Sequence, residues 1–243
     1  MLVLRSLIFN TVFYLNLVIW LIVALPCFLL PRRVLYRMGA AWARCNIRLM
    51  RVIVGTKVEF RGIEHIPEGG LLVAAKHQSF WETFALLPLF ADAAFVLKKE
   101  LTWIPLFGWY ALKTKMVPVD RDGGISAVKA MTAKAREAVD AGRQLVIFPE
   151  GTRRAPGAPP DYKSGTGHLY RRLNKPCLPI ALNSGLFWPR RQFMRYPGTI
   201  IVEILPPIPP GLSQNEFSEK LQGAIEHASD RLCSEGLKSR EVA

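Results

Sequence analysis

The chain has 243 residues, half of them hydrophobic, and a formal net charge of +13 at pH 7. This length suits one domain, or one domain with an appendage, and allows a sizeable core. A chain that is both apolar and strongly basic is unusual for a soluble enzyme and typical of a protein that contacts anionic lipid or anionic substrates. The sequence contains no zinc-finger, helix-turn-helix or aromatic RNA-reading motif, so no nucleic-acid partner is expected. Its four scattered cysteines predict neither a disulfide framework nor a zinc site.

An uncharged stretch runs from Ser6 to Pro31, with arginines on both sides of it. It exceeds the ~20 apolar residues that cross a bilayer. A secretory signal is the alternative, but the apolar part of such signals usually has about 7–15 residues. Two asparagines and Pro26 interrupt the stretch, so a helix lying partly embedded in the membrane is a second possible geometry. Both membrane geometries attach the protein to a bilayer.

The next segment, Arg32 to Val54, is expected to form a basic amphipathic helix. At about 100° per residue, its arginines fall on one narrow face and large apolar residues on the opposite face. No acidic residue precedes Glu59 to pair with these arginines. Such a helix suits the cytoplasmic lipid surface, and a helix packed on the domain with a solvated basic side is the alternative. The arginines are Arg33, Arg37, Arg44, Arg48 and Arg51, and the apolar residues are Leu35, Met38, Trp42, Cys45, Leu49 and Ile53.

The chain is therefore expected to divide into residues 1–55, a two-helix membrane-docking motif, and residues 56–243, one α/β domain. In the second part, apolar runs alternate with helical patterns, the clearest from Ser126 to Ala141. A capping box from Ser213 to Glu216 opens a C-terminal helix that runs towards Gly236. Continuous apolar strands followed by helices predict a largely parallel, mixed sheet covered by helices. The strand candidates are KVEFRG, GLLVAAK, AAFVLKK, TKMVPVD, QLVIFPE, LPIALNS and TIIVEIL.

Polar residues follow four of these strands at the point where each strand ends. In open α/β sheets, ligands bind at the carboxyl edge of the strands. The convergence of four polar strand ends therefore predicts an active site at this edge. The residues are His77, then Asp120 and Arg121, then Glu150 to Arg153, then Asn183 and Ser184.

The first of these strand ends, KHQSFWE, places His77 five residues before Glu82. From the first turn of a helix, the Glu82 side chain can reach back to the imidazole and fix its tautomer, which leaves the other ring nitrogen free to accept a proton. Since the chain has neither G-x-S-x-G nor H-E-x-x-H, a covalent acyl-enzyme and zinc hydrolysis are disfavoured. Direct attack by a substrate hydroxyl, deprotonated by His77, is the chemistry left. An ordinary polar turn at a strand end is the alternative.

The run VIFPEGTRR ends a strand at Pro149 and continues into a turn. The turn offers a glycine that lets the backbone approach a ligand, a hydroxyl, and the planar fork of Arg153, which matches phosphate oxygens. The stretch VPVDRDGG repeats the arrangement with Arg121. Two arginines near one site suggest a phosphorylated substrate. The alternative is a turn in which Glu150 pairs with Arg153.

These stretches together resemble the glycerolipid acyltransferase family, and most closely its bacterial 1-acyl-sn-glycerol-3-phosphate acyltransferases. KHQSFWET, VPVDR, FPEGTR and LPIALNS match four family blocks in order, and the resemblance spans about Lys57 to Pro206. It implies that His77 is the catalytic base and that Glu82 orients it. Glu82 stands where the family more often has Asp, and its extra methylene changes the reach to His77. The implied acceptor-phosphate site consists of Arg121, Glu150, Gly151, Thr152 and Arg153, with Lys163 and Pro179 as accessory substrate contacts.

The resemblance also implies a reaction. A fatty acyl group would pass from acyl-CoA or acyl-carrier protein to the sn-2 hydroxyl of 1-acyl-sn-glycerol 3-phosphate, giving phosphatidate for phospholipid biosynthesis. No metal or bound cofactor is expected, because a thioester is already activated. The expected place is the cytoplasmic face of a bacterial inner membrane. The alternatives are another acceptor, such as a lyso-ornithine lipid or glycerol 3-phosphate, and a non-catalytic membrane lipid-binding protein.

Overall fold

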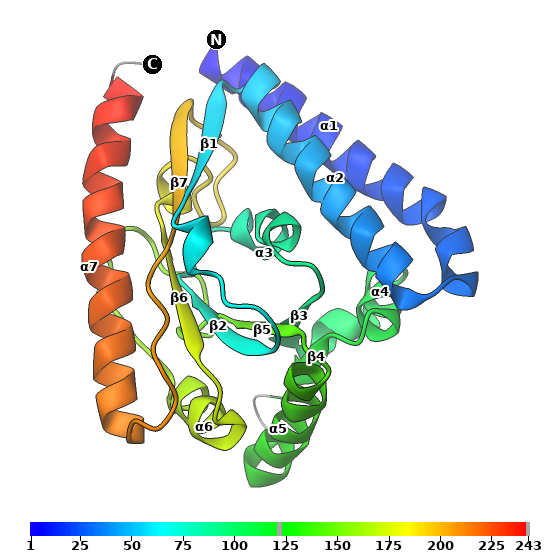
Figure 1. The fold of residues 1–243 in the computed structure, drawn as a ribbon. Coiled ribbons are helices and arrows are strands. Elements are labelled where there is room, and N and C mark those ends of the chain that lie inside the picture. Colours follow the sequence, from blue (N-terminus) through cyan, green and yellow to red (C-terminus); the bar gives the residue numbers. More distant parts are fainter. Residues whose placement is uncertain (121–122, 242–243) are drawn as a thin grey trace.

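A seven-stranded sheet forms the centre of the protein, and helices cover both of its faces (Figure 1). The computed structural model describes residues 1–120 and 123–241. The strands lie in the order β1-β7-β6-β2-β5-β3-β4, and β6 and β7 are the one antiparallel pair of named strands in these two ranges. All seven predicted strands and the largely parallel, mixed sheet are confirmed. The strands are β1 (Thr56–Arg61), β2 (Leu71–Ala75), β3 (Ala93–Lys98), β4 (Val117–Val119), β5 (Gln144–Ile147), β6 (Cys177–Leu182) and β7 (Gly198–Ile204).

The helices lie in two groups on the two sides of the sheet (Figure 1). The α-helices are α1 (Leu2–Val23), α2 (Arg32–Ile53), α3 (Glu82–Ala85), α4 (Phe107–Lys113), α5 (Gly124–Asp140), α6 (Ser164–Leu173) and α7 (Gln214–Glu241). Short 3-10 helices are η1 (Leu25–Leu29), η2 (Ile63–His65), η3 (Leu87–Leu89), η4 (Lys99–Trp103) and η5 (Ser184–Leu186).

Strand β2 explains why the central strands read as continuous apolar runs. Successive side chains of a strand point to opposite faces of the sheet. Leu71, Val73 and Ala75 join a core that also contains residues of α1, α2 and α3. Leu72 and Ala74 join a second core formed with α5, α6 and α7. Because both faces are covered, all five residues are buried, and no polar alternation appears in the sequence.

Helices α1 and α2 form an antiparallel pair joined by η1 (Figure 1). The α1 helix buries only Ser6, Phe9 and Phe13, and the Phe13 ring lies 5.2 Å from that of Trp188. Among the described residues, α1 is the one helix that is long and apolar enough to cross a membrane. It ends at Val23 and does not continue to Pro31, because Pro26 lacks a backbone N–H and lies in the first turn of η1.

Helix α2 presents its predicted arginine face to solvent, and all five arginines of that face are exposed. A different face, marked by Tyr36, Ala43 and Met50 at seven-residue spacing, is buried against the domain. The predicted apolar face is mostly half-buried. The helix therefore packs on the domain, as the alternative interpretation expected, and contact of its basic side with lipid stays a prediction.

A buried ion-pair cluster fixes the start of α2 to the sheet. Arg32 donates two hydrogen bonds of 2.7 Å to the Asp92 carboxylate, and Arg143 donates one of 3.2 Å to the same group. Burial raises the pKa of the Asp92 carboxyl, but the Arg32 hydrogen bonds and the Arg143 charge outweigh it, so this pKa lies below its usual value. Asp92 precedes β3 and Arg143 precedes β5, so one carboxylate joins three parts of the chain.

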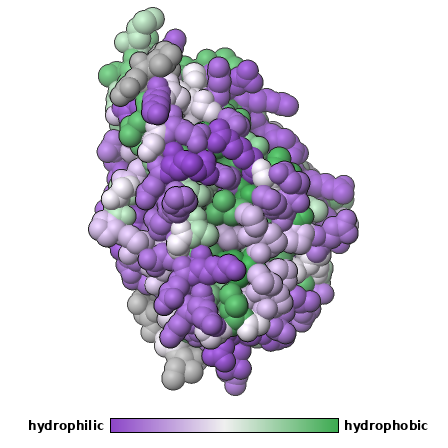
Figure 2. Space-filling view, turned by 60° about the vertical axis from the view of Figure 1, so that its left-hand side comes forward, coloured by the Kyte–Doolittle hydropathy of each residue, from purple (hydrophilic) through white to green (hydrophobic). Residues whose placement is uncertain are grey.

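The capping box that opens α7 is confirmed. The Ser213 N–H donates to Glu216 (2.9 Å), and the Glu216 N–H donates to the Ser213 hydroxyl (3.3 Å). The helix does not stop near Gly236 but continues to Glu241. A Cβ at position 236 would lie 2.6 Å from the Asn183 amide nitrogen, so this glycine permits close packing and does not end the helix. The outer surface on the α7 side is mostly hydrophilic (Figure 2).

Candidate active site

His77 and Glu82 form a hydrogen-bonded pair just beyond the carboxyl end of β2. The distance between His77 Nδ1 and Glu82 Oε1 is 2.9 Å. Glu82 is the first residue of α3, so the turn between strand and helix brings the two side chains together. The added methylene of Glu relative to Asp does not prevent this contact.

The Glu82 carboxylate is fully buried and has three further hydrogen-bond donors. Its Oε1 accepts the backbone N–H groups of Gln78 (2.7 Å) and Ser79 (2.6 Å), and its Oε2 accepts the Ser184 hydroxyl (2.7 Å). The strand end after β6 therefore supports the same carboxylate as the turn after β2. The sequence placed Ser184 at the site edge without a role, and the structure assigns it this contact.

The chemistry of the pair follows from these contacts. A carboxylate that accepts from several donors offers only acceptor oxygens, so the His77 proton resides on Nδ1 and Nε2 has a free lone pair. The imidazole stacks on Phe148 at 4.1 Å between ring centroids, and the His77 side chain is 13% exposed. A positioned, partly accessible Nε2 can take a proton from a hydroxyl that reaches it.

Glu150, which the family resemblance assigns to the phosphate site, contacts Lys76 and the backbone of His77 in the structure. Its carboxylate is buried and accepts a hydrogen bond from Lys76 (3.0 Å) and another from the His77 backbone N–H (3.4 Å). Burial raises the pKa of Glu150, and the charge of Lys76 opposes that rise. The Glu150 carboxylate pairs with Lys76, so it does not form the ion pair with Arg153 that was the alternative interpretation of this turn. Glu150 holds the backbone of the His77 turn.

Lys76 is the centre of a buried polar cluster that the sequence did not predict. Its ammonium also contacts Glu226 of α7 at 2.7 Å, and Tyr162 donates to the same Glu226 carboxylate at 2.8 Å. Burial and the Glu226 charge raise the pKa of Tyr162. The sequence indicates this cluster only through a lysine that directly follows a fully apolar strand. Its partner Glu226 cannot be recognised from the sequence, because it lies 150 residues away.

An arginine cluster lies beside the pair. Burial lowers the pKa of Arg153, and the neighbouring charges of Arg190 and Arg191 lower it further, while the charge of Glu82 opposes them. Arg190 also donates to the Arg153 carbonyl oxygen at 2.8 Å. The Nε groups of Arg154 and Arg190 are buried and have no hydrogen-bond partner among the described residues.

Guanidinium groups gathered in one place can bind an anion through their planar forks. In the described ranges, no ion pair joins a carboxylate to Arg153, Arg190 or Arg191, whereas Arg154 pairs with Asp161 at 2.7 Å and the charge of Glu82 acts on Arg153. The sequence motifs do not indicate Arg190 and Arg191, because these residues follow the fourth block, in WPRR.

The other residues predicted for the site differ in their burial and in their contacts. Gly151 turns the chain with a positive φ of 62°, and Thr152 next to it is half-buried. Lys163 is exposed and pairs with Asp161 at 2.8 Å, and Pro179 is buried within β6. Arg121 lies outside the described residues.

The strand order explains which strand ends meet. The strands β6, β2 and β5 are neighbours, so Ser184, His77 and the turn after Pro149 lie together. The β4 strand is three positions from β2, which corresponds to ~14 Å at normal strand spacing. The predicted convergence therefore holds closely for three strand ends, and the end of β4 lies farther out.

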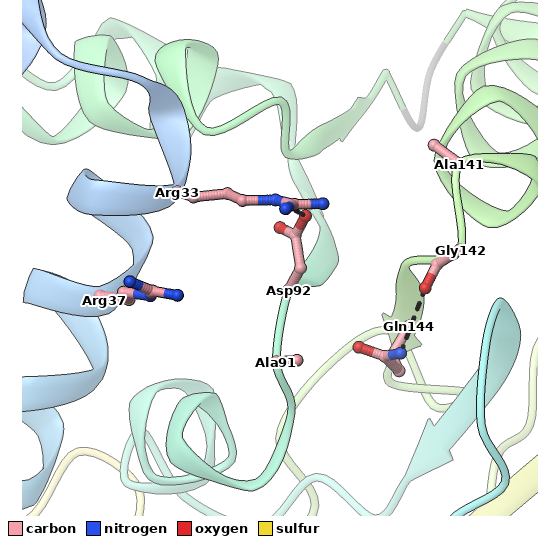
Figure 3. A pocket seen from close by; sticks show the side chains of 7 residues that line it. All are labelled: Arg33, Arg37, Ala91, Asp92, Ala141, Gly142 and Gln144. Carbon is pink, nitrogen blue, oxygen red and sulfur yellow. Dashed lines mark hydrogen bonds and ion pairs between the residues drawn. The ribbon is translucent and has the colours of Figure 1, made fainter.

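A cavity of about 220 Å³ lies away from this site, between α2 and the start of β5 (Figure 3). Its lining includes Arg33 and Arg37 of α2 together with Asp92 and Gln144. Gln144 begins β5, whereas His77 follows the carboxyl end of β2, which is parallel to β5. The cavity and the candidate site therefore lie at opposite ends of the strands. No group of three or more His, Cys, Asp or Glu residues in the described ranges could hold a metal ion.

Comparison with known proteins decides the family. A sequence model of the family described as Acyltransferase matches residues 57–183. The chain belongs to this acyltransferase family. A 1-acyl-sn-glycerol-3-phosphate acyltransferase of Pseudomonas aeruginosa is 40% identical over 179 residues, which cover 73% of this chain and 70% of that protein.

A more distant relative and a solved structure are also similar to this chain. A 1-acyl-sn-glycerol-3-phosphate acyltransferase of Limnanthes alba is 29% identical over 71% of this chain and 62% of its own length. The crystal structure of PlsC, the 1-acyl-sn-glycerophosphate (LPA) acyltransferase of Thermotoga maritima, superposes with a TM-score of 0.80 and 22% identity. That match covers 96% of this chain and 98% of the Thermotoga chain. The fold shared with that structure therefore includes the N-terminal helices as well as the sheet.

Proposed function

We propose that this acyltransferase transfers a fatty acyl group from a thioester donor to the sn-2 hydroxyl of 1-acyl-sn-glycerol 3-phosphate, giving phosphatidate. The single observation that carries the proposal is the His77–Glu82 pair, held by three further donors beside an arginine cluster at the carboxyl end of the sheet. The names of the relatives from Pseudomonas aeruginosa and Limnanthes alba agree with this reaction.

In the proposed reaction, His77 Nε2 takes the proton of the acceptor hydroxyl while the hydroxyl oxygen attacks the thioester carbonyl. The Glu82 carboxylate stabilises the imidazolium that forms. When the tetrahedral intermediate collapses, the C–S bond breaks, and the leaving thiolate takes the proton from the imidazolium. One C–O bond replaces one C–S bond, and the imidazole returns to its starting tautomer.

The acceptor phosphate is proposed to bind the guanidinium groups of Arg153 and Arg190, with Arg121 of the second block as a further ligand. Gly151 and Thr152 would contribute the turn and a hydroxyl. Glu150 is left out of the phosphate site and acts as a positioning residue, because its carboxylate holds Lys76 and the His77 backbone. Lys163 and Pro179 keep only an indirect role, through the loop and strand that they belong to.

The donor is proposed to be acyl-CoA or acyl-carrier protein, with no metal or bound cofactor. The proposed place of action is the cytoplasmic face of a bacterial inner membrane. Residues 1–55 would provide membrane attachment through the apolar α1 and the basic face of α2, and residues 56–243 would carry the reaction. The net charge of +13 suits an anionic lipid surface.

The test is a transfer assay with the purified full chain in neutral detergent micelles. Acyl-CoA and acyl-carrier protein donors are each combined with 1-acyl-sn-glycerol 3-phosphate, a lyso-ornithine lipid and glycerol 3-phosphate. We expect the highest kcat/KM with 1-acyl-sn-glycerol 3-phosphate. Equal use of the lysolipid without phosphate would contradict the acceptor assignment, and turnover no faster than the uncatalysed reaction would indicate a non-catalytic lipid-binding protein.

A further inference from the structure

The segment from Leu101 to Leu112, in η4 and α4, exposes large apolar side chains. Trp103 is 69% exposed and Trp109 is 55% exposed. A soluble protein usually buries tryptophan at least partly, and contiguous apolar patches mark interaction sites. The exposed residues of this surface, named the 101–112 surface below, are Leu101, Trp103, Ile104, Phe107, Trp109 and Leu112.

The backbone holds these side chains outward. Gly108 packs so closely on η4 that a Cβ there would lie 2.0 Å from the Thr102 carbonyl oxygen. Leu106, which precedes α4, has a positive φ of 63°, a conformation that non-glycine residues rarely adopt. A tight and strained turn of this kind fixes the direction of its neighbours, so the apolar exposure is part of the fold.

Contacts beneath the 101–112 surface connect it to the turn between α1 and α2. The Tyr110 hydroxyl donates to the Leu21 carbonyl oxygen, and the Tyr110 ring stacks on Phe28 with 4.8 Å between centroids. The η1 turn and its end expose Leu25, Leu29 and Leu30. The apolar surface of the N-terminal helices therefore continues onto α4, as the position of α4 beside the α1–α2 turn shows (Figure 1).

The charged residues at the two ends of the 101–112 surface are four lysines and Glu100. Lys98 pairs with Glu100, Lys99 with Asp120 and Lys115 with Glu137, and Lys113 is the fourth lysine. Tryptophans within a lysine rim have the composition of a membrane interface, where the aromatic ring sits at headgroup level and lysines meet lipid phosphates. A soluble protein partner would not explain the continuity with the apolar α1 surface.

We propose that the 101–112 surface inserts into the headgroup region of the bilayer as a second membrane contact, beside the N-terminal helices. Its base is tied to the site edge, since Lys99 contacts Asp120 at the end of β4 at 3.2 Å. Insertion would hold this strand end at the depth of the lipid phosphates, where a lysolipid acceptor presents its own phosphate.

The test uses tryptophan fluorescence of the full chain with vesicles of phosphatidylglycerol and phosphatidylcholine. The emission of Trp103 and Trp109 is obtained as the difference between the wild type and a Trp103→Phe/Trp109→Phe variant, which keeps the surface apolar. We expect vesicles to reduce quenching of this component by aqueous iodide several-fold, and lipids brominated on the upper part of their chains to quench it.

Iodide quenching that is unchanged on adding vesicles would overturn the proposal. Protection that appears without vesicles and grows with protein concentration would also overturn it, because a second copy of the chain would then cover the surface. These readouts need no acyl transfer, so they fail or succeed separately from the proposed reaction.

A second measurement is sedimentation with the same vesicles. Trp103→Ser/Trp109→Ser should weaken vesicle binding about tenfold or more, and the loss should persist at high salt because the contact is apolar. Leu237→Ser is the matched control, since Leu237 is 49% exposed on α7, and it should bind as the wild type does. Equal binding of the double variant and the control would also contradict the proposal.

Discussion

Glu82 accepts hydrogen bonds from an imidazole, two backbone N–H groups and a hydroxyl, so its side chain cannot shift without leaving buried donors unpaired. This fourfold contact explains how a glutamate can take the place of the more common aspartate. The carboxylate is located by the backbone of the turn and by Ser184, and His77 is then located by the carboxylate. The turn after β2 lies where the longer side chain of Glu82 can still reach His77.

The first prediction concerns this pair. His77→Ala should lower transfer by about 10²–10⁴-fold, the usual contribution of a positioned general base, with unchanged thermal unfolding. Glu82→Asp should lower both the transfer rate and the free energy of unfolding, the latter by about 1–3 kcal/mol, because the shorter side chain leaves a buried donor unpaired. Near-normal turnover of His77→Ala would show that His77 is not the general base.

The second prediction concerns the arginine cluster. Lysine keeps the charge but lacks the planar fork, so Arg153→Lys or Arg190→Lys should raise the acceptor KM about 10–100-fold and leave the donor KM nearly unchanged. Lys163→Gln is the control, because Lys163 is exposed and paired with Asp161, and its acceptor KM should stay close to the wild-type value. Equal loss of donor and acceptor use would show that the cluster does not bind the acceptor phosphate.

At the scale of elements, α7 contains two glycines with different surroundings. Gly→Ala in an exposed helix interior usually stabilises by about 0.5–1 kcal/mol. At Gly223 nothing lies within 4 Å of an added Cβ, whereas at Gly236 it would meet Asn183 at 2.6 Å. Gly223→Ala should therefore raise the free energy of unfolding, and Gly236→Ala should lower it. Denaturant unfolding measures both, and stabilisation by both would mean that α7 does not pack closely on Asn183.

The next prediction concerns the cluster that joins α2 to the sheet. Asp92→Asn would leave Arg143 buried without its charge partner and should lower the free energy of unfolding by about 3 kcal/mol at neutral pH. Because the pKa of Asp92 is lower in the folded protein, its stabilising contribution is present above its unfolded pKa of about 3.9 and is lost as pH falls through the folded value. The difference between the wild type and the variant should therefore shrink below pH ~4. A difference that stays constant from neutral pH down through that range would contradict the role given to Asp92.

At the scale of the whole molecule, the exposed arginine face of α2 is proposed to contact lipid through charge, unlike the apolar contacts proposed for α1. Arg44→Gln/Arg48→Gln should weaken binding to anionic vesicles, because each basic residue near such a surface contributes about 1 kcal/mol. Charge interactions are screened by salt, so wild-type binding should itself fall and approach that of the variant at high ionic strength. Sedimentation at two salt concentrations measures this, with neutral vesicles as the control. A defect that persists at high salt would indicate a packing role instead.

The accuracy of the sequence-based predictions depended on whether the signal was local. The seven strands were predictable because a strand buried on both faces is a continuous apolar run, and the start of α7 was predictable because its capping box spans four residues. The partner of Glu150 was not predictable, because Lys76 lies 74 residues away. The sequence predicts a helix that runs towards Gly236, and its continuation to Glu241 was not predictable, because the role of this glycine is a close contact with Asn183 of another element.

The buried face of α1 has a consequence for synthesis on the ribosome. Phe13 packs on Trp188, and the Arg195 N–H donates to the Ser6 hydroxyl at 2.9 Å across 189 residues of sequence. At about 5–20 residues per second, roughly 10–40 s pass between the emergence of α1 and that of its partners. During this interval α1 has only a nascent chain, a chaperone or a bilayer to cover it. Delivery of the ribosome to the membrane within those seconds would let lipid receive the helix before the enzyme is complete.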